Sequence, residues 1–181
     1  MTVGNQHDLY REAGELFAPA IARLARAMEY DGEKARDLEQ DIHCELFRSF
    51  ARFERQCALK TWVYRVAHNV AAEHRLRESR GKTPLALDEI EDLPEPGDAE
   101  RSAAENHAVA RAQRMIRRLP TLDAQVMLLW LEGESGKDIA DVTGLSPGSV
   151  TTRIHRLKTA LASEFETETA PSTAPTQETA R

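Results

Sequence analysis

The chain has 181 residues, of which 41% are hydrophobic and 6% aromatic, and its formal net charge at pH 7 is −6. This length allows one domain or two small ones, and abundant Ala, Leu, Arg and Glu favour helices, because these side chains lose little rotamer freedom there. No stretch approaches the roughly 18 consecutive apolar residues of a membrane-spanning helix, and the first residues lack the apolar core of a signal peptide. We therefore expect a cytoplasmic protein without membrane insertion.

Three helices are expected in the first 80 residues. Apolar residues recur at steps of three and four over residues 8–28, 34–50 and 60–79, and residues 51–60 are expected to form a loop or short helix. The apolar stripe of the first helix comprises Leu9, Ala13, Leu16, Phe17, Ala20, Ile21 and Leu24. The polar sides of the third helix carry Arg65, His68, Asn69, His74 and Arg75.

Charge is unevenly distributed along the chain. Residues 41–82 hold 9 basic and 5 acidic side chains, whereas residues 83–107 hold 1 basic and 8 acidic ones. The negative net charge is therefore concentrated in one short segment that follows a basic block. Such asymmetry is compatible with nucleic-acid binding by the basic part, in spite of the acidic total.

A proline- and carboxylate-rich segment separates the first helices from a second helical region. Proline and clustered like charges both oppose a packed core in this segment. We therefore expect an all-α protein, in which two small helical domains are joined by a flexible acidic linker. The expected boundaries are residues 1–80 for the N-terminal domain, 81–104 for the linker, 105–166 for the C-terminal domain and 167–181 for a disordered tail.

The C-terminal domain carries the pattern of a helix-turn-helix. A helix over residues 122–131 is followed by a short one over residues 137–143, which Ser135 can cap with Asp138 three positions on. Gly144 stands just past the short helix, where a left-handed residue costs least if it is glycine. Ser146 can then cap a last helix, whose first position is proline.

The last helix combines a buried face with a polar and basic outer face. Its expected inner face comprises Val150, Ile154, Leu157, Leu161 and Phe165. Its outer face presents Ser149, Thr151, Thr152, Arg153, His155, Arg156 and Lys158. Small polar and basic side chains near the start of such a helix suit reading of the DNA major groove, although a helical hairpin with a solvated basic face would show the same pattern.

The whole chain resembles the extracytoplasmic-function (ECF) class of bacterial RNA polymerase sigma factors. Three stretches carry the resemblance: residues 35–42 (ARDLEQDI), Phe53 with residues 59–69 (LKTWVYRVAHN), and residues 131–156 around the helix-turn-helix. Their order and spacing also agree with the family. The resemblance implies an initiation factor that binds core RNA polymerase, directs it to promoters and assists promoter melting, with promoter DNA and an anti-sigma factor as further partners.

The resemblance also implies roles for particular residues. Polymerase binding would involve Asp37, Leu38, Gln40 and Asp41. Contact with the melted −10 element, including a flipped-out base held by the loop from Phe53 to Thr61, would involve Phe53, Arg55, Lys60, Trp62, Arg65 and Asn69. Reading of the −35 element would involve Ser149, Thr151, Thr152, Arg153, His155 and Arg156. Aromatic surfaces suit unstacked bases and cations suit phosphates, so these residue types fit the implied tasks.

Other classes of function find less support in the sequence. The residues His43, Cys44, Cys57, His68 and His74 form no close metal-binding pair, and buried cysteines are the better account of the two thiols. We find no nucleophile motif and no phosphate-binding glycine loop, so we expect neither enzymatic activity nor a cofactor. A stand-alone helix-turn-helix regulator and an adaptor that binds polymerase without reading DNA remain alternatives.

Overall fold

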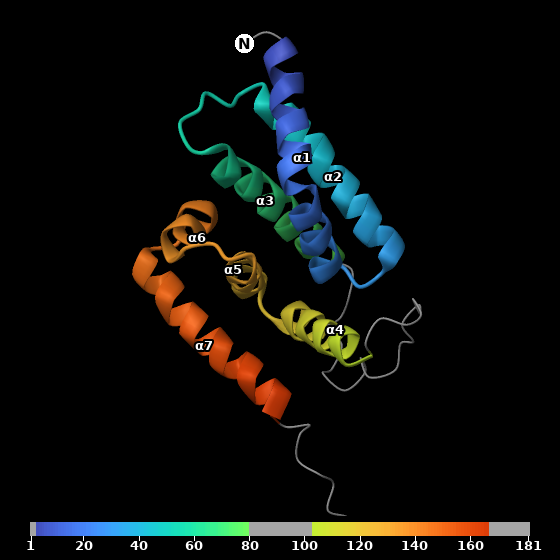
Figure 1. Cartoon of the computed structure of the whole chain (residues 1–181), viewed down its shortest axis with the longest axis vertical. Helices are drawn as coiled ribbons and strands as arrows, with labels where there is room; N and C mark the ends of the chain where they lie inside the picture. Colours follow the sequence, from blue (N-terminus) through green and yellow to red (C-terminus); the bar gives the residue numbers. More distant parts are fainter. Residues whose placement is uncertain (1–2, 80–102, 167–181) are drawn as a thin grey trace, which may run out of the picture.

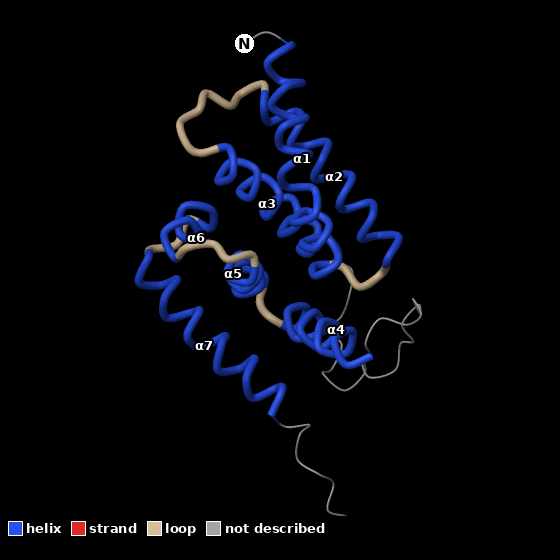
Figure 2. The backbone as a smooth tube through the Cα atoms, in the orientation of Figure 1, coloured by secondary structure: helices blue, strands red, loops and turns tan. Residues whose placement is uncertain are grey.

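The computed structural model describes residues 3–79 and 103–166, and within these ranges the chain forms seven α-helices and no strand (Figures 1 and 2). The helices are α1 (Val3–Met28), α2 (Gly32–Phe50), α3 (Leu59–Ser79), α4 (Ala103–Arg118), α5 (Thr121–Leu131), α6 (Gly136–Thr143) and α7 (Pro147–Glu166). The expected all-α class is confirmed. The predicted disordered tail and nearly all of the predicted linker lie outside the described residues.

Helices α1, α2 and α3 pack together as an N-terminal bundle. Asp31 ends the turn after α1 and caps α2, since its carboxylate accepts hydrogen bonds from the backbone N–H groups of Glu33 and Lys34 at 2.8 and 3.1 Å. The buried residues of α2 recur at helical spacing, and Leu38, Ile42 and Leu46 are all at most 1% exposed. This stripe is the centre of the bundle core.

Two expectations about the bundle are wrong. Leu16 does not belong to the buried stripe of α1, because it is 62% exposed and falls outside the sector that α2 and α3 cover. His68 was expected on a polar side of α3 but is only 4% exposed. The reason is tertiary: α5 packs on α3 there, and the Gln125 side chain donates to the His68 carbonyl at 2.8 Å.

Helices α5, α6 and α7 form the expected helix-turn-helix, preceded by α4. Ser135 caps α6, whose Asp138 N–H donates to the Ser135 hydroxyl at 3.1 Å, and Gly144 ends α6 in the left-handed region at φ 73°. Ser146 accepts from the Ser149 N–H at 3.2 Å at the start of α7. These local predictions are confirmed because each depends on a cap and its immediate neighbours.

The two helix groups also contact each other. α4 packs against α1, and α5 and α6 pack against α3, whereas α7 packs on α5 and α6 and runs along their far side (Figure 1). As a result, α3 lies between the rest of the bundle and the helix-turn-helix, while no other described helix covers one face of α7. None of the described helices has the length and apolarity to cross a membrane.

Candidate nucleic-acid and polymerase interface

A groove of about 700 Å³ runs between α2 and α3 on the surface of the bundle. It is lined by Asp41, Cys44, Glu45, Arg48, Ser49, Arg52, Trp62, Arg65, Val66, Asn69, Val70, Glu73 and Arg77. The lining therefore brings together Trp62, Arg65 and Asn69 from the predicted −10 set. Its four arginines and the partly buried Trp62 offer partners for phosphates and for an unstacked base, although Arg48 and Arg77 also lie near the carboxylates of Glu45 and Asp41.

The aromatic side of this groove is fixed by packing. The ring centroids of Trp62 and Phe53 lie 5.2 Å apart, and the Trp62 indole N–H donates to the buried Ser49 hydroxyl at 3.0 Å. Phe53 also packs edge-on against Phe50 and is only 2% exposed. The prediction that Phe53 contacts DNA is therefore wrong for this conformation, because its ring belongs to the core and supports Trp62 from behind.

Lys60 and Arg65, both from the predicted −10 set, contact the helix-turn-helix. Lys60 Nζ lies 2.6 Å from a Glu134 carboxylate oxygen and 3.8 Å from Asp138. Glu134 raises the pKa of Lys60 through this contact, because the carboxylate stabilises the charged amine. Arg65 Nη2 donates to the Asp141 carbonyl at 2.7 Å, so the edge of the groove is joined to α6.

Arg55 stands apart from these residues. It lies in the loop between α2 and α3, is exposed, and has a φ of 58°. A side chain other than glycine seldom adopts this left-handed region, so the loop conformation carries some strain. Arg55 does not line the groove between α2 and α3.

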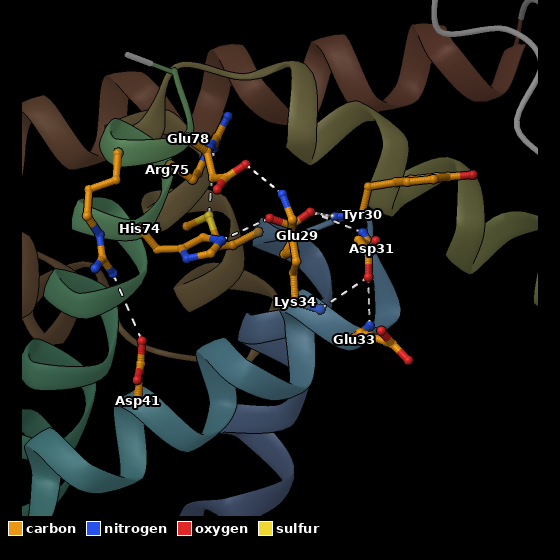
Figure 3. A network of polar contacts seen from close by, with 11 residues as sticks. Glu29, Tyr30, Asp31, Glu33, Lys34, Asp41, His74, Arg75 and Glu78 are labelled. Atoms are coloured by element: carbon orange, nitrogen blue, oxygen red, sulfur yellow. Dashed lines mark hydrogen bonds and ion pairs between the residues drawn. The ribbon is translucent and has the colours of Figure 1, made fainter. Parts of the chain in front are cut away.

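The predicted polymerase-binding residues are divided between surface and core. Asp37, Gln40 and Asp41 are exposed on α2, whereas Leu38 is fully buried. Leu38 is therefore a core residue, and its prediction as a polymerase contact is wrong, since no atom of it is available to a partner. The Asp41 carboxylate lies 4.0 Å from the Arg77 guanidinium of α3 (Figure 3).

The predicted −35 residues lie on one accessible side of α7. The exposed members are Ser149, Thr151, Thr152, His155 and Arg156, and Arg153 is partly buried. The Thr151 and Thr152 hydroxyls donate to the carbonyls of Pro147 and Gly148 at 3.0 and 3.1 Å, which fixes their rotamers. The start of α7 thus presents short polar side chains followed by basic ones.

Asp123 organises the basic part of α7, and sequence reasoning missed it. This α5 carboxylate is 5% exposed, and its two oxygens accept hydrogen bonds from Arg153 Nη1 and from Arg156 Nη2, the latter at 2.7 Å. A lone acid inside the apolar helix Thr121–Leu131 was the available signal. Its arginine partners 30 and 33 residues later could not be identified without the fold.

The thiols and imidazoles do not assemble into a site. Cys44, expected to be buried, is exposed on α2, and Cys57 is partly buried in the loop before α3. Within residues 3–79 and 103–166, no group of three or more His, Cys, Asp and Glu side chains could hold a metal ion.

Comparisons with known proteins match this arrangement. The family model described as Sigma-70 region 2 covers residues 15–81, and the one described as Sigma-70, region 4 covers residues 110–161. The ECF RNA polymerase sigma factor SigM of Mycobacterium tuberculosis is 30% identical over 143 residues, which cover 78% of this chain and 69% of that protein. The chain belongs to the ECF class of RNA polymerase sigma factors. It is accordingly a promoter-directing subunit of RNA polymerase rather than a stand-alone regulator.

Further relatives of this ECF sigma factor agree in sequence and fold. The RNA polymerase sigma-H factor of Pseudomonas aeruginosa is 29% identical over 146 residues, which cover 73% of each chain. The sigma factor RpoE of Bartonella quintana, solved with the anti-sigma factor NepR, has a TM-score of 0.67 at 19% identity and covers 87% of this chain and 96% of that one. CnrH, solved with the cytosolic domain of CnrY, has a TM-score of 0.64 at 19% identity and covers 88% and 89%.

Proposed function

We propose that this sigma factor binds a promoter at two places, with the α2–α3 groove on the melted −10 strand and α7 on the −35 duplex. The observation that carries the proposal is the pair of separate surfaces. One is a groove lined by four arginines, three carboxylates and a tryptophan, and the other is a helix whose polar and basic face is covered by no other helix among the described residues. A single-stranded segment needs the first kind of surface and a major groove the second.

At the −10 element, Trp62, Arg65 and Asn69 would bind the unpaired strand within the groove. Lys60 at the start of α3 and Arg55 in the loop before it would contribute cations from outside the groove. The half-buried Trp62 ring offers a face for base stacking, which contributes about 1–3 kcal/mol per base. Phe53 would act indirectly, by holding the Trp62 ring in place. Stacking of this kind favours the unpaired state, so the same residues would assist melting.

At the −35 element, α7 would enter the major groove with its N-terminal half. Thr151, Thr152, His155 and Arg156 are exposed there, and Ser149 lies at the helix start, where backbone N–H groups favour phosphate. Arg153 is partly buried, so it would contribute through its ion pair with Asp123 rather than by reaching a base.

Core polymerase would bind the bundle through the exposed side chains of Asp37, Gln40 and Asp41 on α2. The proposed domains are residues 1–80 and 105–166, with residues 81–104 as an acidic connection that can follow a basic channel of the polymerase. We further propose that the protein acts in the cytoplasm, catalyses no reaction by itself and needs no cofactor.

An anti-sigma factor is proposed as a second partner. RpoE and CnrH, which share the fold, were solved with the anti-sigma factor NepR and with the cytosolic domain of CnrY. A partner of this kind would compete with polymerase for the same helical surfaces.

Run-off transcription with purified core polymerase and a library of genomic fragments tests the proposal. Addition of the protein should start transcription at a defined subset of fragments that share two elements. Lys60→Ala and Arg65→Ala variants should form fewer open complexes on duplex templates, and on templates with a pre-melted −10 region they should recover only in part, because their contacts to the unpaired strand are also lost. No stimulation on any fragment, or tight binding to a duplex operator without polymerase, would favour the adaptor or the stand-alone regulator instead.

A further inference from the structure

The hydroxyl groups at the start of α7 make their hydrogen bonds within the helix-turn-helix itself. The hydroxyls of Thr151 and Thr152 donate to backbone carbonyls of the preceding turn at 3.0 and 3.1 Å. The hydroxyls of Ser146 and Ser149 lie 2.9 Å apart and share a hydrogen bond. Because a hydroxyl has one proton to donate, neither threonine keeps a donor for a DNA base in this arrangement.

Each of the two threonines also carries a methyl group, on the same carbon atom as its hydroxyl. Since the hydroxyl is turned back toward the helix backbone, the methyl group takes another staggered position on Cβ. The side chains of Thr151 and Thr152 are both exposed. The first turns of α7 therefore offer apolar as well as polar contact to a major groove.

Thr152 has the better position of the two for such a contact. Successive residues of a helix are about 100° apart, so Thr152 lies almost opposite the fully buried Val150 and faces away from the core of the domain. Gly148 stands one turn before Thr152, and the space beside this glycine is open among the described residues. Arg156 follows one turn later on the same face, and its side chain is 65% exposed.

The 5-methyl group of thymine is the chemical group that matches this surface. Thymine is the one base of unmodified DNA with a methyl group in the major groove, and a threonine methyl can recognise it by apolar contact. We propose that Thr152 is a specificity-determining residue that recognises a thymine of the −35 element through contact between the two methyl groups. Arg156 supplies hydrogen bonds on the same face, since its guanidinium has five N–H groups and Asp123 binds it through one nitrogen. This inference rests on the proposed role of α7 and adds to it the base that is recognised.

The contact can be tested by removing the methyl group from either side of it. The holoenzyme, formed from the full chain and core polymerase, is used below saturation on a promoter selected by run-off transcription. Each thymine of the −35 element, on both strands, is replaced in turn by uracil, which lacks only the methyl group. At one position this replacement should lower initiation by about fivefold, the effect of one lost methyl contact.

Two variants of Thr152 then separate its methyl group from its hydroxyl. Thr152→Ser keeps the hydroxyl, and it should initiate about as poorly on thymine as the wild type does on uracil and no longer distinguish the two bases. Thr152→Val replaces the hydroxyl by a second methyl group and should keep the distinction. If instead the serine variant keeps it and the valine variant loses it, the hydroxyl reads the base and the methyl contact is overturned.

The matched control is Thr159, whose exposed hydroxyl donates to the His155 carbonyl at 3.1 Å in the same way, about two turns further along α7. Thr159→Ser should keep the distinction between thymine and uracil. If other base substitutions in the −35 element lower initiation but no uracil replacement does, the methyl contact is overturned while the proposed role of α7 stands. Indifference to every −35 substitution overturns both.

Discussion

Helices α3 and α7 carry the two proposed DNA-binding surfaces, and they differ in what holds their cations. On α7, Arg156 is bound by Asp123 of the same helix-turn-helix and remains 65% exposed at its side chain. On α3, Lys60 is bound by Glu134, which belongs to the other helix group. The duplex-reading surface is therefore preorganised within its own module, whereas two cations beside the surface for unpaired DNA, Lys60 and Arg65, are held by a neighbouring module.

The two helices also differ in what lies against them. α7 is free to meet an intact duplex, because no described helix besides α5 and α6 packs substantially on it. On α3, Lys60 and Arg65 contact the helix-turn-helix, whereas the groove that contains Trp62 and Asn69 is open.

If the bundle and the helix-turn-helix are separate modules, a substitution in the core of one should destabilise that module more than the other. A core substitution should also have the largest effect of those considered. Leu38→Ala removes a fully buried side chain of α2, so it should lower the free energy of unfolding of the bundle by about 2–5 kcal/mol. Urea unfolding measures this loss, and hydrogen exchange shows whether α7 keeps its protection. Asp41→Asn, on the exposed side of α2, should leave stability unchanged and weaken polymerase binding instead. Equal loss of protection in α7 would contradict separate modules.

A substitution of Arg156 tests whether the exposed face of α7 reads the −35 element. Arg156→Glu should lower transcription from promoters that depend on the −35 element by about a hundredfold, the upper range for loss of one major-groove contact. Transcription from a pre-melted template should fall much less, because α3 binds there. Arg118→Glu makes the same charge change on an exposed position of α4 and should have little effect. Unchanged promoter choice in the Arg156 variant would favour the adaptor.

The burial of His68 on α3 should make the stability of the protein depend on pH. Burial lowers the pKa of His68 to about 4, because its imidazole lies between α3 and α5 and cannot be solvated when charged. The stabilising contribution is complete above the unfolded pKa of 6.5 and is lost as pH falls toward 4. Between pH 7 and pH 5 the unfolding free energy should decrease by about 1–2 kcal/mol. Urea titrations at both values measure this, and His68→Leu should remove most of the dependence, whereas His155→Gln on exposed α7 should keep it.

Local features of the fold could be predicted from the sequence, whereas contacts between distant helices could not. Ser135 and Gly144 mark the ends of α6 correctly, because a cap depends on residues within one turn. Leu16 and His68 were placed wrongly, because helical periodicity shows that a face exists but not which neighbour covers it. The sequence was equally ambiguous for Phe53. An aromatic residue in a loop can form part of a binding surface, or it can lie in the core beneath that surface and support it.

The candidate site shows the same limit more sharply. Family resemblance located Trp62, Arg65 and Asn69, and the structure brings them to one groove. The resemblance gave no indication that Lys60 would face Glu134, because charged residues on a helix usually indicate a face exposed to solvent. The charge pairs between modules depend on the docking geometry, which no local pattern encodes.

Substitution of Asp123 should have the smallest effect of those considered, but it tests most specifically whether the arginines of α7 are oriented from within their own module. Asp123→Asn keeps the size of the side chain but removes the charge that orients Arg153 and Arg156, so we expect about a fivefold loss of −35 recognition. The measurement is run-off transcription on a series of −35 base substitutions, because loss of orientation should flatten base preference as well as lower activity. Asp123→Glu should recover part of that preference. If preference is unchanged while stability falls, Asp123 serves only the fold, and α7 is no more preorganised than α3.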